Sequence, residues 1–195
     1  MKIFDKYETK DVKVEDLGLQ RVINLNEKLI LKSHGRHTGK FGKLKVNIVE
    51  RLINLVGVPG HRGKKHKLQT AWASGKYSKN AKIVLDALSR IEEKTKQNPV
   101  QVLVKAVENS APRDEVTTIE YGGAKYPQAI DTSPLRRLNL ALRNLVHGAQ
   151  DKSFRKKANI SEALAKEILL AAEGNAESFA FQKRRDSEKQ ADGAR

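Results

Sequence analysis

Apolar residues recur at helical spacing along most of this 195-residue chain, and this periodicity constrains its fold more than any other feature. The valine and isoleucine residues at positions 46, 49, 53 and 56, for example, would line one side of a helix. Two further helix starts are marked, because Asn98-Pro99 and Ser133-Pro134 place a capping residue before a proline, which the first helical position tolerates. The pattern predicts about six helices, over residues 43–57, 78–98 (capped by Ser78), 98–112, 133–149, 161–171 (capped by Ser161) and 176–190.

Between positions 112 and 133 the spacing changes from helical to alternating, which is typical of strands. Residues 115–121 and 124–131 flank Gly122 and Gly123, and glycine tolerates the positive φ angles of a two-residue hairpin turn. We therefore predict a mainly α fold, a helical bundle of about six helices with a protruding two-stranded β-hairpin at about residues 115–131.

The glycine turn also fixes which residues face one another across this hairpin. Glu120 would face Lys125 as an opposite-charge pair, and Ile119 would face Tyr126 as a branched and aromatic pair. Pro127 cannot donate a hydrogen bond to a further strand, so we expect a two-stranded ribbon with free edges. Such a ribbon is marginally stable alone, and it must lean on the helices or on a partner.

The net charge of +15, from 38 basic and 23 acidic residues, is concentrated in two parts of the chain. Residues 32–67 contain 10 basic residues and one acidic residue, and residues 133–158 carry a net charge of +6. Basic residues held together in this way repel one another unless a polyanion neutralises them. A solvated surface explains a short lysine cluster, but two blocks of this size favour a nucleic acid partner. A membrane surface would instead require a basic amphipathic helix, which the glycines within residues 33–43 disfavour.

Tests for catalytic and ligand-binding motifs predict no enzyme. The chain has no cysteine, which excludes disulfides, thiolate zinc sites and cysteine nucleophiles. Residues 35–40 resemble a phosphate loop, but Phe41 stands where Ser or Thr would bind magnesium. His34 and His37 have a spacing that zinc tolerates but lack acidic neighbours, so RNA contact is the better interpretation. We predict no cofactor, no metal and no small-molecule substrate and, since no run of 18 apolar residues occurs, a cytoplasmic protein without membrane contact.

Four segments closely resemble the small-subunit ribosomal protein S-seven family in its archaeal form. They are the run from Asn98 to Arg113, the run from Ala129 to Arg137, residues 41–55 and residues 162–172. The resemblance implies a structural protein that binds the 3′ major domain of small-subunit ribosomal RNA and nucleates assembly of the head. It also implies a place near the exit site for transfer RNA and messenger RNA, beside neighbouring head and platform ribosomal proteins. The alternative is a non-ribosomal helical protein that binds nucleic acid with a recognition helix in a groove.

This reading treats residues 1–195 as a single RNA-binding ribosomal protein domain. Within it we expect a basic N-terminal extension and loop over residues 1–42 and a helical core with the hairpin over residues 43–182. Residues 183–195 are polar, and we expect them to form a frayed C-terminal tail.

The resemblance assigns RNA contacts to the basic residues before the first long helix, to the helix that begins at Pro134 and to the hairpin. The two charge blocks add the basic residues and the histidine of the adjoining loops. The predicted RNA-binding residues are Lys32, Arg36, His37, Lys40, Lys43, Lys45, Arg62, Lys64, Lys65, Lys67, Arg113, Tyr121, Lys125, Tyr126, Arg136, Arg137, Arg143, Arg155, Lys156 and Lys157. The alternative for the helix arginines is that they only solvate its surface. Because residues 113–132 carry a net charge of −2, we expect the hairpin to act through shape or tyrosine stacking rather than by holding phosphates.

Overall fold

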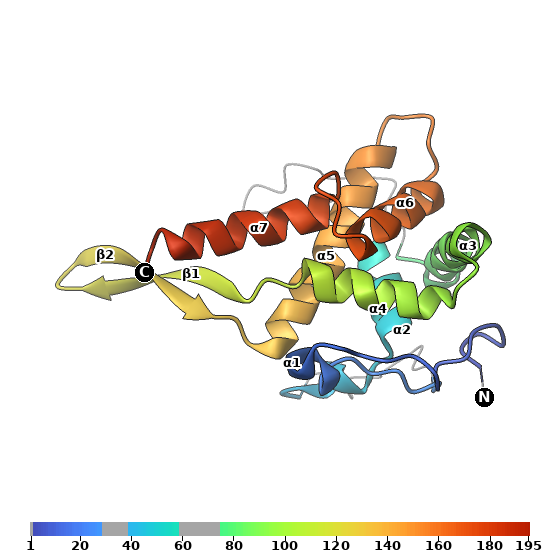
Figure 1. The fold of residues 1–195 in the computed structure, drawn as a ribbon, viewed down its shortest axis with the longest axis horizontal. Coiled ribbons are helices and arrows are strands. Elements are labelled where there is room, and N and C mark those ends of the chain that lie inside the picture. The colour runs from blue at the N-terminus through green and yellow to red at the C-terminus, as the bar shows by residue number, and fades with distance from the viewer. Residues whose placement is uncertain (1, 29–38, 59–74) are drawn as a thin grey trace.

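A computed structural model describes residues 2–28, 39–58 and 75–195 of the chain (Figure 1). Within these ranges the mainly α fold with a β-hairpin is confirmed. The elements are α1 (Leu17–Gln20), the 3₁₀ helix η1 (Gly42–Lys45), α2 (Ile48–Val56), α3 (Tyr77–Thr95), α4 (Pro99–Ser110), β1 (Asp114–Tyr121), β2 (Ala124–Asp131), α5 (Pro134–Ser153), α6 (Ile160–Ala172) and α7 (Phe179–Asp192).

Two helices start where their Pro residues predict. Asn98 caps α4, because its side-chain oxygen accepts a hydrogen bond from the Val100 N–H at 3.0 Å, and Pro99 is the first helical residue. Ser133 occupies the cap position of α5 ahead of Pro134, although its side chain makes no capping hydrogen bond. The dipeptide pattern therefore located both boundaries to the residue.

The predicted start of the first long helix at residue 43 is wrong. Residues 42–45 form the separate turn η1, and α2 begins at Ile48 because the side chain of Asn47 accepts a hydrogen bond from the Val49 N–H at 2.9 Å. The apolar side predicted from positions 46, 49, 53 and 56 is nevertheless buried.

Two predicted serine caps are also wrong. Ser78 lies in the first turn of α3, whose cap position is Lys76, and that helix ends at Thr95 because Lys96 adopts a left-handed conformation with φ of 54°. Ser161 lies inside α6 and is buried. Its side chain hydrogen bonds the Asp86 carboxylate of α3, which lowers the pKa of Asp86 below its usual value.

The bundle core is aliphatic, with α5 and α6 at its centre. Leu138, Leu142, Leu145 and Ala149 form the predicted apolar side of α5, and each is at most 1% exposed. We call these four residues the leucine seam. The helix α6 packs against α3, α4 and α5. This packing leaves the opposite side of α5 free to carry polar residues.

A buried carboxylate joins three helices of the bundle. Glu167 of α6 is fully buried and accepts hydrogen bonds from Lys152 Nζ at 2.6 Å, Ser178 Oγ at 2.8 Å and the Ala180 N–H at 3.1 Å. A side chain at Gly148 of α5 would lie 2.8 Å from this carboxyl group, so glycine is required for the close approach. The network fixes where α7 begins.

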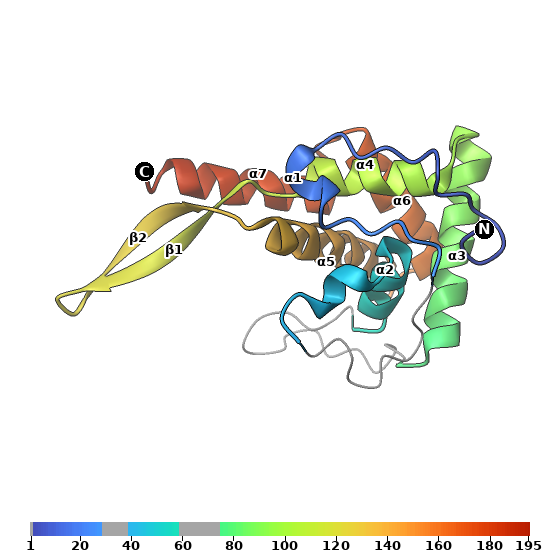
Figure 2. The same cartoon turned by 90° about the horizontal axis from the view of Figure 1, so that it is seen from below.

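Residues 2–28, here called the N-terminal strap, pack against the outside of the helices and add apolar side chains to the core. Figure 2 shows this segment running along α4 toward the start of α5. The strap buries Ile3 and Leu19 completely, and Glu108 of α4 accepts hydrogen bonds from the N–H groups of Glu15 and Asp16 at 2.7 and 3.0 Å. The charge balance of this segment gave no sign of such a packing role.

The frayed C-terminal tail predicted over residues 183–195 is wrong for residues 183–192, which continue α7 to Asp192. Ala191 is buried, and Ser187 Oγ donates a 3.1 Å hydrogen bond to the Asp114 carbonyl at the start of β1. In Figures 1 and 2 the helix lies alongside the bundle and reaches the base of the hairpin. Contacts with β1 and β2 hold this polar helix in place.

The hairpin has the predicted register. Glu120 pairs with Lys125 and Ile119 pairs with Tyr126, while Gly122 and Gly123 have φ angles of 60° and 80°. The two strands project from one end of the molecule (Figures 1 and 2), and most of their residues are exposed. Among the described residues, α7 supplies most of the helical contacts with them, and these contacts lie at the hairpin's base.

Candidate nucleic-acid interface

Exposed arginines form a row on the side of α5 that faces away from the leucine seam. Arg136 and Arg143 are seven residues apart, which places them about 20° apart around the helix. Both are exposed, and Arg136 also pairs with Glu115 of β1 through a 2.5 Å contact between Nε and Oε2. That pairing uses Nε and leaves the two terminal nitrogens of the guanidinium as donors.

The loop after α5 carries further exposed cations. Arg155, Lys156 and Lys157 are exposed, and Arg155 has a left-handed backbone with φ of 56°. The Arg155 guanidinium lies 5.3 Å from the centre of the Phe154 ring, a distance at which the ring attracts a cation. At a rise of about 1.5 Å per residue, the cations from Arg136 to the end of α5 and its loop span roughly 25–30 Å. We call Arg136, Arg143 and residues 155–157 the α5 stripe.

A second set of exposed cations precedes α2. Lys40, Lys43 and Lys45 are exposed, and Lys40 Nζ lies 5.4 Å from the centre of the Phe41 ring. The helix that follows is tied to α5, because Arg51 Nη2 donates a 2.6 Å hydrogen bond to Asn139 Oδ1. This bond joins α2, which follows the three lysines, to α5, which carries the stripe.

Arg51 itself is a buried cation. Its side chain is 7% exposed, and removal from water lowers its pKa to about 10. The guanidinium therefore stays charged at neutral pH and adds positive potential beneath the neighbouring surface. Sequence reasoning counted this residue in the charge block but did not expect it to be buried.

Arg137 occupies a different position from the other two arginines of α5. It is 8% exposed, its Nη2 lies 2.7 Å from Asp16 Oδ2 of the N-terminal strap, and its Nε donates a 3.2 Å hydrogen bond to the Pro112 carbonyl. RNA could reach this guanidinium only by breaking the ion pair. We therefore leave Arg137 out of the candidate interface, in contrast to the prediction from the sequence.

Asp16 remains ionised beside this arginine. Its partial burial acts to raise the pKa of the carboxyl, but the hydrogen bond and charge of Arg137 and the N–H groups of Gly18 and Leu19 outweigh it. The net effect is a pKa below the usual value. The pair is therefore intact at neutral pH.

The hairpin offers exposed rings rather than cations. Tyr121 is 82% exposed and Tyr126 57% exposed, and Lys125 faces the acidic Glu120 across the strands. At the base of the hairpin, Arg113 is exposed and its N–H donates a 3.2 Å hydrogen bond to Glu188 Oε1. This surface suits stacking or shape recognition and holds little positive charge.

Comparison with known proteins identifies the family. The family model for ribosomal protein S7p/S5e matches residues 20–195. The chain belongs to this family. Its relatives include proteins named small ribosomal subunit protein uS7 from Nanoarchaeum equitans (48% identical over 196 residues, covering 100% of this chain and 99% of the relative) and Methanothermobacter thermautotrophicus (47% identical over 188 residues, 96% and 95%). A third, from Thermoplasma volcanium, is 43% identical over 194 residues, 99% of this chain and 100% of the relative.

The resemblance to the S7p/S5e family in its archaeal form is therefore confirmed. Members of this family are structural proteins of the small ribosomal subunit and not enzymes. The family model begins at residue 20, whereas the matches to the two relatives at 48% and 43% identity cover essentially the whole chain, including the N-terminal strap.

Seven of the predicted RNA-binding residues of this S7p/S5e family member lie outside the described residues. They are Lys32, Arg36, His37, Arg62, Lys64, Lys65 and Lys67. The interface described above therefore consists of the α5 stripe, the lysines before α2 and the exposed hairpin.

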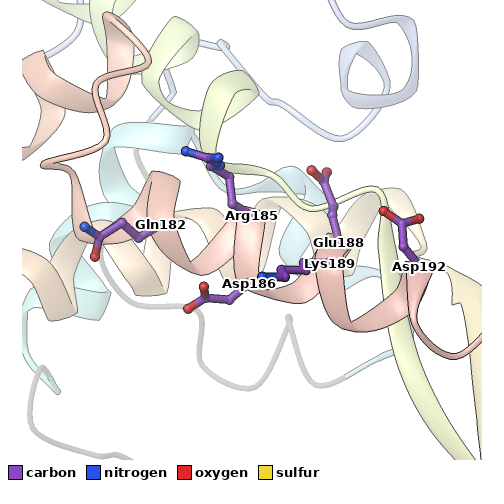
Figure 3. A pocket seen from close by; sticks show the side chains of 6 residues that line it. All are labelled: Gln182, Arg185, Asp186, Glu188, Lys189 and Asp192. Atoms are coloured by element: carbon purple, nitrogen blue, oxygen red, sulfur yellow. The ribbon is translucent and has the colours of Figure 1, made fainter.

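The surface hollow of about 540 Å³ beside α7 is not part of this interface (Figure 3). The described residues that line it all come from α7, and they are Gln182, Arg185, Asp186, Glu188, Lys189 and Asp192. With three acidic and two basic side chains, this lining does not favour an anion such as phosphate.

The described ranges show neither a metal cluster nor a membrane-spanning helix. They contain no group of three or more His, Cys, Asp or Glu side chains placed to hold a metal ion. Their helices are all too short or too polar to span a membrane.

Proposed function

We propose that this S7p/S5e family member fulfils its structural role in the small ribosomal subunit by binding the 3′ major domain of the ribosomal RNA. In this proposal it nucleates assembly of the head of the subunit within the cytoplasmic ribosome. Neighbouring head and platform proteins are its protein partners, and the exit site for transfer RNA and messenger RNA lies nearby. The proposal rests on family membership and on the geometry of the exposed cations.

The α5 stripe is the observation that carries the proposal. Its cations are exposed, follow one side of a helix and continue into a loop, so they would meet phosphates along a path of roughly 25–30 Å. Recognition of folded RNA depends on shape and on backbone contacts of this kind. The lysines before α2 widen the same surface, and the predicted contacts at positions 32, 36, 37, 62, 64, 65 and 67 belong to this charge block in the sequence.

The hairpin has a separate role in the proposal. Its two strands project from the bundle, and its exposed rings at Tyr121 and Tyr126 are suited to stacking on bases. We propose that the hairpin reaches toward the exit site, where it contributes through shape and stacking rather than through charge.

A binding comparison tests the proposal against a general affinity for nucleic acid. The protein is titrated with a fragment of small-subunit ribosomal RNA that contains the 3′ major domain, and with duplex DNA of equal charge at the same salt concentration. We expect the RNA fragment to bind at least about 100-fold more tightly, because specific sites exceed nonspecific ones by several orders of magnitude. Equal affinity for the two nucleic acids would contradict the ribosomal role and favour a non-ribosomal DNA-binding protein.

A matched pair of variants tests whether RNA binds the proposed surface. Arg143→Met removes an exposed cation of the α5 stripe, and Lys94→Met removes an exposed cation of α3. Each substitution removes one positive charge and keeps a long side chain. The first change should weaken RNA binding because Arg143 lies on the proposed surface, and the second should not because Lys94 lies outside it.

A further inference from the structure

Side chains of α5 and α7 hydrogen bond the backbone that leads from α4 into the hairpin. We call residues 109–115 the hairpin root. Its carbonyl groups accept hydrogen bonds from side chains of α5 and α7, and one of its N–H groups donates a hydrogen bond to α7. The N-terminal strap supports the α5 side through Asp16. Among the described residues, no helix side chain hydrogen bonds the strands beyond residue 115.

Arg137 joins the strap, the root and α5. Its Nε donates to the Pro112 carbonyl at 3.2 Å, and its Nη2 pairs with Asp16 at 2.7 Å. Because Asp16 is anchored by the Gly18 N–H at 2.8 Å and its own N–H is bonded to Glu108 of α4, the guanidinium is held from both ends. Arg137 thus links its own helix to two other segments, the strap and the root.

The C-terminal helix α7 holds the other side of the root. Arg184 Nη1 donates to the Asn109 carbonyl at 3.0 Å, and its Nε pairs with Glu188 Oε1, also at 3.0 Å. The same Glu188 oxygen accepts the Arg113 N–H at 3.2 Å. Ser187 Oγ donates to the Asp114 carbonyl at 3.1 Å, so three successive root residues are bonded from α7 or α5.

These bonds are placed where solvent screens them weakly. The side chains of Arg137 and Asp16 are 10% and 22% exposed, and those of Arg184 and Glu188 are 23% and 27% exposed. Hydrogen bonds in which one partner is charged are stronger than neutral ones, and partial burial limits their screening by salt. A two-stranded ribbon lacks this stability of its own.

We propose that Arg137 is a positioning residue which, together with Asp16 and the Arg184, Ser187 and Glu188 side chains of α7, fixes the direction in which the hairpin projects from the bundle. The importance of that direction rests on the proposed function, in which the hairpin reaches toward the exit site. Eight residues at about 3.3 Å each make a strand roughly 26 Å long, so a tilt of about 10° at the root moves the tip by about 5 Å.

A distance measurement between the hairpin and the bundle tests this positioning. The chain has no cysteine, so Thr118→Cys on β1 and Glu93→Cys on α3, both exposed positions, accept one spin label each. We expect a narrow distance distribution for the doubly labelled protein. Arg137→Met and Asp16→Asn should each broaden the distribution or shift its mean by about 2 Å, because Thr118 lies about 13 Å along the strand from the root, and Arg137→Lys should partly restore the original distribution.

Two further variants separate positioning from general loss of stability. Ser187→Ala removes one hydrogen bond to the root from α7 and leaves Arg137 intact, so it carries the test if Arg137→Met fails to fold by circular dichroism. Arg143→Met, on the same helix as Arg137 but exposed, should leave the distribution unchanged. Unaltered distributions in Asp16→Asn, Ser187→Ala and every folded Arg137 variant would overturn the proposal.

The same variants distinguish this inference from the proposed function. Arg143→Met should lower the salt dependence of RNA binding without moving the hairpin, and Arg137→Met should move the hairpin without lowering the salt dependence. If the salt dependence of Arg143→Met is unchanged, the assignment of the α5 stripe fails while the distance result stands. If only the distances are unchanged, the positioning role fails and the RNA surface stands.

Discussion

The helical bundle and the hairpin differ in how much of their apolar surface is buried and in what holds them in place. In the bundle, aliphatic side chains such as Leu142 are fully buried and the cations lie outside. In the hairpin, Ile119 and Tyr121 are 46% and 82% exposed, and two strands without a core depend on the root for their attachment. In the proposed function, this difference corresponds to two kinds of contact with RNA, one through charge on the bundle and one through shape on the hairpin.

The largest contrast between the regions should appear in folding stability. Leu142→Ala removes a side chain that is 1% exposed, and we expect it to lower the free energy of unfolding by about 2–5 kcal/mol. Ile119→Ala on the hairpin should cost less than about 1 kcal/mol, because cross-strand pairs contribute only that much. Urea denaturation of both variants checks the contrast, and equal losses would show that the hairpin belongs to the same cooperative core.

A smaller loss should follow from the buried carboxylate of the bundle. Glu167→Gln removes the charge that faces Lys152 Nζ at 2.6 Å, and we expect a loss of about 1–3 kcal/mol. Glu162→Gln, on the exposed first turn of the same helix, serves as the control and should cost less than about 1 kcal/mol. If the two variants unfold at the same urea concentration, the Glu167 network does not stabilise the start of α7.

The ion pair between Asp16 and Arg137 beside the root should make folding stability depend on pH. The pKa of Asp16 is below its usual value in the folded chain, so its pairing with Arg137 stabilises the fold above the unfolded pKa of about 3.9. This contribution is lost as pH falls from about 4 through the folded pKa. Asp16→Asn should therefore be less stable than the parent at pH 7 and converge with it below that range, as thermal unfolding across pH would show. A constant difference at all pH values would contradict this prediction.

The smallest effect on stability should come from the hairpin tip. Tyr121→Ser removes a ring that is 82% exposed, and we expect a change within about 0.5 kcal/mol. The same variant should weaken RNA or transfer RNA contact by about 1–3 kcal/mol if the ring stacks on a base. Thermal unfolding and binding measured on one preparation separate the two effects, and a loss of stability without a loss of binding would show that the ring packs within the protein.

Local patterns in the sequence predicted the parts of this fold that depend on neighbours along the chain. The apolar side of α5 and its start at Pro134 follow from helical spacing and from the geometry of Pro at a first turn. The hairpin register follows from Gly122 and Gly123, because only a two-residue turn with positive φ angles brings Ile119 opposite Tyr126.

Features made by distant segments could not be predicted in the same way. The N-terminal strap has neither a helical nor an alternating pattern, and its attachment depends on single side chains such as Glu108 of α4. Positions 183–192 are polar and suggested a frayed tail, but Arg184 and Ser187 bond to backbone carbonyls of the hairpin root, which a count of polar residues does not show.

Arg136 and Arg137 show what the sequence could not predict about the candidate interface. Both belong to one basic run, and their positions on α5 differ by about 100° around the helix. The sequence shows that difference, but it does not show that the strap brings Asp16 to one side and leaves the other side exposed. Arg137 is thereby assigned to the support of the hairpin root, whereas Arg136 pairs with Glu115 through Nε and remains exposed on the surface.

The salt dependence of RNA binding tests the central claim most directly. The logarithm of the association constant for the 3′ major domain fragment is measured against the logarithm of salt concentration for the parent, for Arg136→Met with Arg143→Met, and for Tyr121→Ser. We expect a steep slope in the parent, a slope lower by roughly 1.4–1.8 in the double variant, and the parent slope in the hairpin variant. An unchanged slope in the double variant, or a reduced slope in the hairpin variant, would contradict the division of the molecule into a bundle surface that binds through positive charge and a hairpin that does not.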